Sequence, residues 1–71
     1  MDYLVVIEKG RIGYGAYVPD LPGCVAAADS RKAVLKLIRE GIKLHLEAMI
    51  EAGEPIPPAT SRSEIVRVCA A

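Results

Sequence analysis

The sequence predicts an α+β domain in the order β-β-β-α-β, in which one long helix covers one face of a four-stranded, mainly antiparallel sheet. Two runs of strand-forming residues, at 3–9 and 14–18, flank a glycine-containing turn, as in a hairpin. A segment dense in proline and glycine follows, and after it one amphipathic stretch is long enough for several helical turns. A β-branched run then returns near residue 64, which adds the last strand.

Residues 3–9 and 14–18 are expected to form the two arms of the hairpin. The first run, Tyr-Leu-Val-Val-Ile-Glu-Lys, is rich in β-branched residues and carries apolar side chains on both faces of a strand. Side chains alternate along a strand, so Tyr14 and Tyr17, three residues apart, point to opposite faces of the sheet. Each face is therefore predicted to carry one phenol.

The stretch from Tyr17 to Cys24, which we call the hinge, reads Tyr-Val-Pro-Asp-Leu-Pro-Gly-Cys and is predicted to be a rigid turn. Pro19 and Pro22 each lack a backbone donor and have a fixed φ, and Gly23 can adopt a positive φ. No strand or helix can continue through such a segment. The remaining elements are therefore expected to be arranged around the hinge.

After the hinge we expect a short third strand and then the helix. Residues 24–28, Cys-Val-Ala-Ala-Ala, form a weak strand sequence that is expected at a sheet edge. Ser30 can accept a hydrogen bond from the first helical turn and is the predicted N-cap, and Gly53 is well placed to end the helix in a left-handed conformation. The helix is therefore expected to run to about Ala52.

The helix is predicted to be amphipathic, with one broad apolar arc against the sheet and a charged face toward water. The arc comprises Val34, Leu35, Leu37, Ile38, Gly41, Ile42, Leu44, His45, Leu46, Ala48 and Met49. Residues 55–58, Pro-Ile-Pro-Pro, cannot extend the helix and are expected to connect it to the fourth strand at residues 64–69. A right-handed crossover would place this strand parallel to the first.

Size and composition predict one domain, residues 1–71, that associates with other chains. A chain of this length buries only about 60% of the surface that it exposes when unfolded. Yet 52% of its residues are apolar. Since one helix covers only one face of the sheet, a second copy is expected to cover the other, in a homodimer or a higher homo-oligomer.

Charge and composition argue against several kinds of partner and site. Nine basic and nine acidic residues give a net charge of zero, whereas nucleic-acid binders carry a basic excess, so no direct nucleic-acid partner is expected. The sequence shows no signal-peptide pattern and no apolar run of membrane length, which favours a cytoplasmic location without membrane contact. Cys24 and Cys69 lack metal-ligand spacing and are expected to be buried as small apolar residues, so no metal or cofactor is predicted.

Three stretches of the chain are similar to those of a known family. They are Tyr-Leu-Val-Val-Ile-Glu from residue 3, Tyr-Val-Pro-Asp-Leu-Pro-Gly-Cys from residue 17, and Glu-Ala-Gly-Glu-Pro-Ile-Pro-Pro from residue 51. In this order, and with the long helix among them, they resemble the small HicB-like antitoxins, which neutralise HicA-type toxins that cleave messenger RNA. The resemblance spans nearly the whole chain.

The resemblance implies a partial ribonuclease-H-like fold without nuclease activity, a dimer, and a HicA-type toxin as partner. The expected mechanism is steric: the chain covers the RNA-binding and catalytic surface of the toxin, so that messenger RNA cannot enter. Longer relatives append a module that binds the promoter of their operon, and such binding is not expected of these 71 residues. The alternative is an orphan dimeric module of the same fold that binds another protein or a small ligand.

Three hinge residues are the candidates for contact with the partner: Tyr17, Asp20 and Leu21. Asp20 is held between two prolines and could face a basic toxin. The competing interpretation is that its carboxylate accepts hydrogen bonds from backbone N–H groups of the turn itself. Leu21 would be an anchor for the partner if it were exposed, and a plug at the end of the sheet if it were buried.

An enzymatic function has little support in the sequence, and no catalytic residue is predicted. A metal-dependent nuclease of the ribonuclease-H type would need clustered carboxylates, for which the candidates are Glu8, Glu40 and Glu64. The helical periodicity places Glu40 on the solvent face, and the other two are single charges at strand ends, so surface charge is the better interpretation. His45 lies in the apolar arc without an identifiable catalytic companion and is expected to be a packed core or interface residue.

Overall fold

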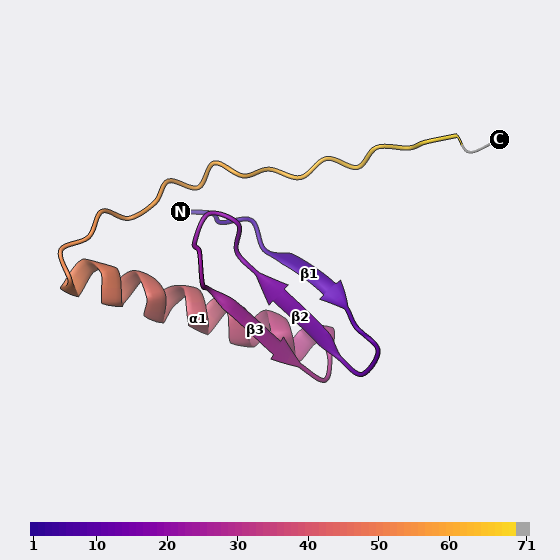
Figure 1. The fold of residues 1–71 in the computed structure, drawn as a ribbon, viewed down its shortest axis with the longest axis horizontal. Coiled ribbons are helices and arrows are strands. Elements are labelled where there is room, and N and C mark those ends of the chain that lie inside the picture. The colour runs from indigo at the N-terminus through magenta and orange to yellow at the C-terminus, as the bar shows by residue number, and fades with distance from the viewer. Residues whose placement is uncertain (70–71) are drawn as a thin grey trace.

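Residues 1–69, the part of the chain that the computed structural model describes, form a three-stranded antiparallel sheet with one long helix packed across one face (Figure 1). The elements are β1 (Val6–Lys9), β2 (Tyr14–Tyr17), β3 (Val25–Ala28) and α1 (Arg31–Glu51), and the strand order is β1-β2-β3. The predicted α+β class is confirmed, as is the order of the first three strands and the helix.

β1 and β2 form the predicted hairpin, with Val6 opposite Tyr17, and β3 pairs with β2 at the sheet edge. The strands are shorter than predicted, since β1 begins at Val6 rather than at residue 3 and β2 and β3 are each one residue shorter. The two phenols lie on opposite faces, as predicted. Tyr14 packs against the core under α1, whereas Tyr17 is 41% exposed on the other side.

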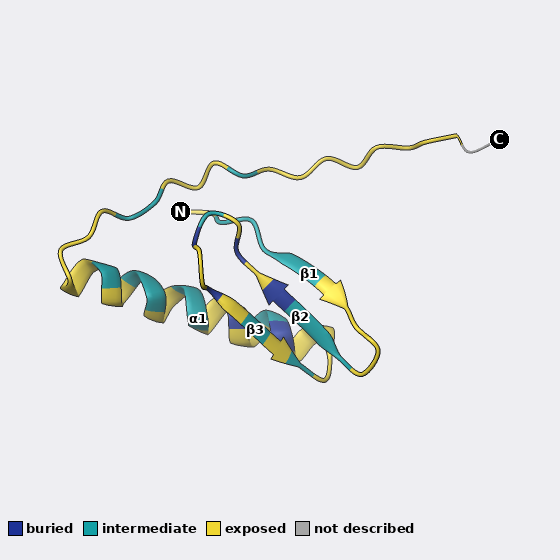
Figure 2. Cartoon of the chain, in the orientation of Figure 1, coloured by how far each residue is buried: buried dark blue, intermediate teal, exposed yellow. Residues whose placement is uncertain are grey.

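The core is small and lies between the sheet and the first half of α1 (Figure 2). Its buried residues are Ala16, Val18, Leu21, Cys24, Val34 and Ile38. Leu21 and Val34 are 0% exposed, so the hinge reaches under the helix and Leu21 closes the end of the sheet. Tyr3, Val5 and Ile7 pack against this cluster from the β1 side.

The two cysteines have different surroundings. Cys24 is buried, as predicted, and its burial raises the pKa of the thiol. Cys69 is exposed, so its predicted burial is wrong. The physical reason is that the segment carrying Cys69 lies away from the core.

Both ends of α1 have the predicted caps. The Ser30 hydroxyl accepts a hydrogen bond from the backbone N–H of Ala33 at 3.1 Å, and Gly53 follows the helix with a φ of 72°. The buried face of the helix is narrower than the predicted arc, because Leu37 is 46% and Leu44 is 66% exposed. Three short strands cover only the central stripe of a helix, and its flank stays open.

Residues 62–69, which we call the arm, contain no strand, and the predicted parallel pairing with β1 is wrong. The arm is extended but exposed: Ile65 is 99%, Val66 is 72% and Val68 is 77% exposed. Figure 1 shows the chain after α1 turning back past the N terminus and then continuing beyond β1. The β-branched pattern indicates an extended backbone correctly, but it does not specify which edge that backbone pairs with.

Gly23 has a φ of +85°, the positive value that the hinge sequence predicts. Its substitution by valine puts a β-branched residue in the left-handed region, which costs about 1–3 kcal/mol. No described atom lies within 4 Å of the added Cβ, so backbone strain accounts for the loss. Urea denaturation of Gly23→Val should show it, whereas Gly23→Asn should lose much less, because asparagine tolerates this region. Equal stability of the valine variant and the unmodified chain would contradict this account.

Candidate partner-binding surface

The face of the sheet opposite α1, which we call the open face, is uncovered and carries one apolar row. Antiparallel pairing places two rows of residues on it: Val6, Tyr17 and Val25, then Glu8, Gly15 and Ala27. Val25 is 70% and Tyr17 is 41% exposed. Apolar side chains that gather on one uncovered face are typical of protein-binding surfaces.

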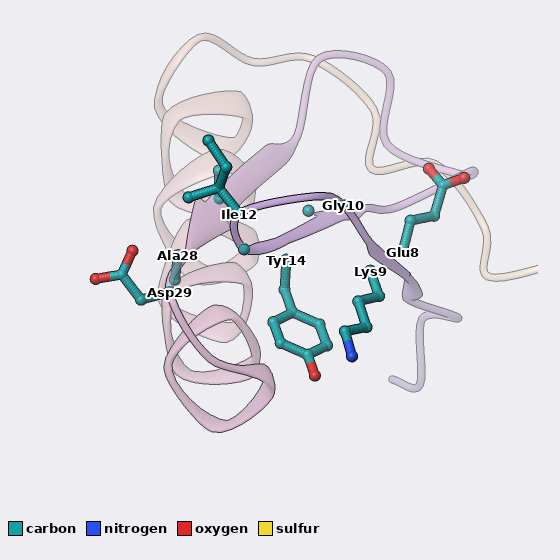
Figure 3. Close-up of a pocket in the computed structure, with 10 residues that line it drawn as sticks. Glu8, Lys9, Gly10, Ile12, Tyr14, Ala28 and Asp29 are labelled. Atoms are coloured by element: carbon teal, nitrogen blue, oxygen red, sulfur yellow. The ribbon is translucent and has the colours of Figure 1, made fainter.

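The second row leads into a shallow hollow of about 650 Å³ beside the β1–β2 turn (Figure 3). Gly15 and Ala27 line the hollow without large side chains to fill it, and Ile12 in the turn is 92% exposed. Figure 3 shows Lys9 and Tyr14 pointing together to one side of the strands, and Tyr14 lies on the α1 side, away from the open face. The open face thus combines an apolar row, centred on Tyr17, with a hollow that can receive an apolar side chain of a partner.

The carboxylate of Asp20 fastens the hinge to the segment that follows α1. Its Oδ2 accepts hydrogen bonds from the backbone N–H groups of Thr60 at 3.0 Å and Ser61 at 2.9 Å. Its Oδ1 accepts from the hydroxyls of the same two residues, at 3.3 and 2.7 Å. Nearby, the Tyr3 hydroxyl donates to the carbonyl of Pro57. These contacts anchor residues 57–61 to the hinge and to the start of the chain.

The interpretation of Asp20 as an acceptor of backbone N–H groups is correct in its chemistry, but the expected partners are wrong. The N–H groups belong to residues 40 and 41 positions further along the chain, not to the turn. Two prolines leave the hinge few donors of its own. The only feature of the sequence that indicates these partners is the pair Thr60 and Ser61 after the proline-rich connector, and nothing in that pair identifies Asp20 as the acceptor.

The hydrogen bonds lower the pKa of the Asp20 carboxyl below its ordinary value of 3.8, and the backbone N–H of Ser61 contributes most. A carboxyl with a lowered pKa in the folded state stabilises that state at pH above the unfolded value and stops doing so as the pH falls through the folded value. We therefore expect residues 57–61 to stay anchored from neutral pH down to about 3.8, and to detach as the pH falls further, through the lowered pKa of Asp20. Amide hydrogen exchange across this pH range measures the anchoring.

Replacing Asp20 by asparagine should speed amide exchange at Thr60 and Ser61 severalfold at pH 7, because the amide has one acceptor oxygen where the carboxylate has two charged ones. Asp29→Asn, at an exposed position beyond β3, is the matched control and should leave exchange at these residues unchanged. Unaltered exchange in Asp20→Asn would show that the anchor does not depend on this carboxylate.

Of the three predicted contact residues, the structure places only Tyr17 on the open face. Leu21 is enclosed in the core, which is the plug interpretation, and the Asp20 oxygens are taken up by Thr60 and Ser61. Sequence reasoning missed Val25 as a candidate contact residue. It shares a face with Tyr17 only through the register of β2 and β3, which no local pattern reveals.

The side chains considered for catalysis are not assembled into a site. Within residues 1–69 no group of three His, Cys, Asp or Glu side chains could hold a metal ion, so Glu8, Glu40 and Glu64 do not form a cluster. His45 is half-buried on α1 and lines a depression together with Pro22 and Pro57. In the same described range, α1 is too polar to cross a membrane.

Comparison with known proteins shows where this chain belongs. The family described as the HicB_like antitoxin of bacterial toxin–antitoxin systems matches residues 3–69. The chain is a member of the HicB-like antitoxin family. A chain in the solved HicA3 and HicB3 toxin–antitoxin complex is similar to this HicB-like protein, with a TM-score of 0.70 and 32% sequence identity. The similarity covers 83% of this chain and 70% of that one.

Proteins of similar sequence occur in a phage and in two bacteria. A 14.9 kDa protein from the rep–hol intergenic region of Haemophilus phage HP1 is 40% identical over 80% of this HicB-like chain, which spans 43% of the phage protein. A UPF0150 protein of Synechocystis is 35% identical over 79% of the chain and is covered over 72% of its own length. A UPF0150 protein of Helicobacter pylori is 49% identical over 58% of the chain, which covers 57% of that protein.

Proposed function

We propose that this HicB-like chain is an antitoxin that binds a HicA-type toxin through its open face and keeps messenger RNA away from it. The observation that carries the proposal is the uncovered apolar row of Val6, Tyr17 and Val25. Family membership and the similarity to a chain of the HicA3 and HicB3 complex support the choice of partner.

The mechanism is steric and requires no reacting group on this chain. The open face belongs to a sheet that α1 backs, so it can dock with little loss of conformational entropy. Tyr17 provides a rigid aromatic anchor at its centre, and the hollow beside Gly15 and Ala27 accepts a side chain from the toxin. The toxin surface that is covered in this way is closed to RNA. We place this action in the cytoplasm, where messenger RNA is translated.

The experiment is to express the chain together with each HicA-type toxin of its own genome and to purify by a tag on the toxin. We expect one toxin to retain the chain, and calorimetry of the purified pair to give a defined stoichiometry. Retention of the chain by none of these toxins, with the chain folded and in excess, would contradict the proposal and favour the orphan module.

A further inference from the structure

We propose that the arm of one copy adds as a strand to the free edge of β3 in a second copy, and that two copies exchange their arms reciprocally. Residues 64–68 would form the added strand. The inference concerns association of the chain with itself and does not depend on the proposed function.

The arm has the composition of a strand but none of the contacts of one. It reads Glu-Ile-Val-Arg-Val over residues 64–68, and Ile65 is 99% exposed. The radius of gyration is 14.3 Å, whereas a compact chain of this length has about 11 Å. Apolar β-branched residues held extended in water are typical of a segment that pairs with another chain.

The anchor explains why the arm does not fold onto its own β3. Hydrogen bonds from Thr60 and Ser61 to Asp20 fix the start of the arm at the hinge. From there, Figure 1 shows the arm running along the β1 side of the sheet, with β2 and β3 on the other side of β1. The anchored arm therefore projects outward, toward a neighbouring molecule.

The two free edges of the described sheet differ in their protection. β1 ends in Glu8 and Lys9, both exposed, and charged residues at an edge discourage pairing with another chain. β3 consists of Val25 and three alanines, without charge or proline. Its outer edge therefore accepts a further strand more readily.

The surroundings of the β3 edge are apolar on both faces. Val25, 70% exposed, borders it on the open face. Leu37 and Leu44 are seven residues apart and therefore share one flank of α1. Leu35 lies on the opposite flank, where it lines a depression together with Tyr3, which lies before β1 in the chain. The leucine pair is therefore on the β3 side of the helix. A strand placed here would be apolar on both of its faces to match.

The arm offers apolar side chains to both faces, and its charges fit as well. Because side chains alternate, Ile65 and Arg67 point to one face of an added strand, and Glu64, Val66 and Val68 point to the other. The exposed residues Glu40 and Glu47 border the leucine pair on α1, each three positions after a leucine. Arg62 and Arg67 give the arm two cations opposite this acidic border.

Reciprocal exchange gives a closed pair. Each copy has one arm and one β3 edge, so a two-fold axis satisfies both at once and leaves neither arm exposed. Two contacts per pair also make the assembly tighter than a single arm on a single edge.

Light scattering of the full chain and of two double variants tests the exchange. The arm variant Val66→Lys/Val68→Lys has a charged arm and an unchanged β3 edge. The edge variant Leu37→Lys/Leu44→Lys has charges beside the β3 edge and an unchanged arm. All four side chains are exposed in the single chain, so both variants should fold. The unmodified chain should have the mass of two copies, and each variant alone the mass of one.

A mixture of the two variants should regain the two-copy mass, because the intact arm of the edge variant can bind the intact edge of the arm variant. Lys36→Ala/Lys43→Ala, on the solvent side of α1, is the control and should stay paired. A single-copy mass for the unmodified chain, pairing that survives the arm substitutions, or a mixture that stays unpaired would each overturn the proposal. Since no toxin is present, none of these results bears on toxin binding.

Discussion

Replacing Leu21 by alanine is expected to lower the free energy of unfolding by about 2–5 kcal/mol, the range for buried leucines truncated in a packed core. Leu21 is 0% exposed and closes the end of the sheet, where the hinge prolines restrict the backbone and hinder its collapse into the cavity. Native domains have only about 5–15 kcal/mol of stability, and small ones lie near the lower end. Chemical denaturation should therefore show unfolding at a clearly lower denaturant concentration than for the unmodified chain.

Ile12→Ala is the matched control for this prediction. Ile12 is 92% exposed in the β1–β2 turn, so its truncation should change stability by no more than about 0.5 kcal/mol. If Leu21→Ala lost as little as the control, Leu21 would not be the plug that the structure shows, and its availability to a partner would need to be considered again.

Replacing Tyr17 by lysine is expected to weaken binding of a HicA-type toxin by about 30-fold or more, the effect of losing a central aromatic anchor worth at least about 2 kcal/mol. Tyr17 lies in the middle strand, with Val6 and Val25 on either side, and its side chain is 41% exposed. Lysine removes the aromatic contact and places a charge in an interface that excludes water. Calorimetric titration of toxin with each variant measures the loss.

Two further variants make this result specific. Tyr17→Phe keeps the ring and should retain most of the affinity, whereas Lys43→Glu changes a charge on the solvent side of α1 and should have no effect. Thermal denaturation must show that Tyr17→Lys is folded. Unchanged affinity of the folded lysine variant would move the toxin site away from the open face.

The parts of the fold that the sequence predicted depend on local rules. Ser30 at the start of α1 and Gly53 at its end are recognisable from a few neighbouring residues, because the capping groups act within one turn. The hinge follows in the same way from Pro19, Pro22 and Gly23. The hairpin also needs only its turn and the alternation of its strands.

The errors concern contacts between distant segments. The arm has the β-branched pattern of a strand, but pairing requires a free edge within reach, and the Asp20 anchor directs the arm away from the sheet. Leu37 and Leu44 fit the apolar arc, yet a sheet of three described strands is too narrow to cover them. Val25 joins Tyr17 only through strand register. Each depends on tertiary placement, which periodicity does not encode.

Inhibition of RNA cleavage tests the central claim most directly. A HicA-type toxin from the same genome would be incubated with messenger RNA and increasing amounts of the chain, with Tyr17→Lys as a parallel titration. We predict that cleavage stops once the chain matches the toxin in the stoichiometry of their complex, and that the lysine variant needs a large excess. Cleavage that continues at full rate in the presence of excess folded chain would contradict the antitoxin function.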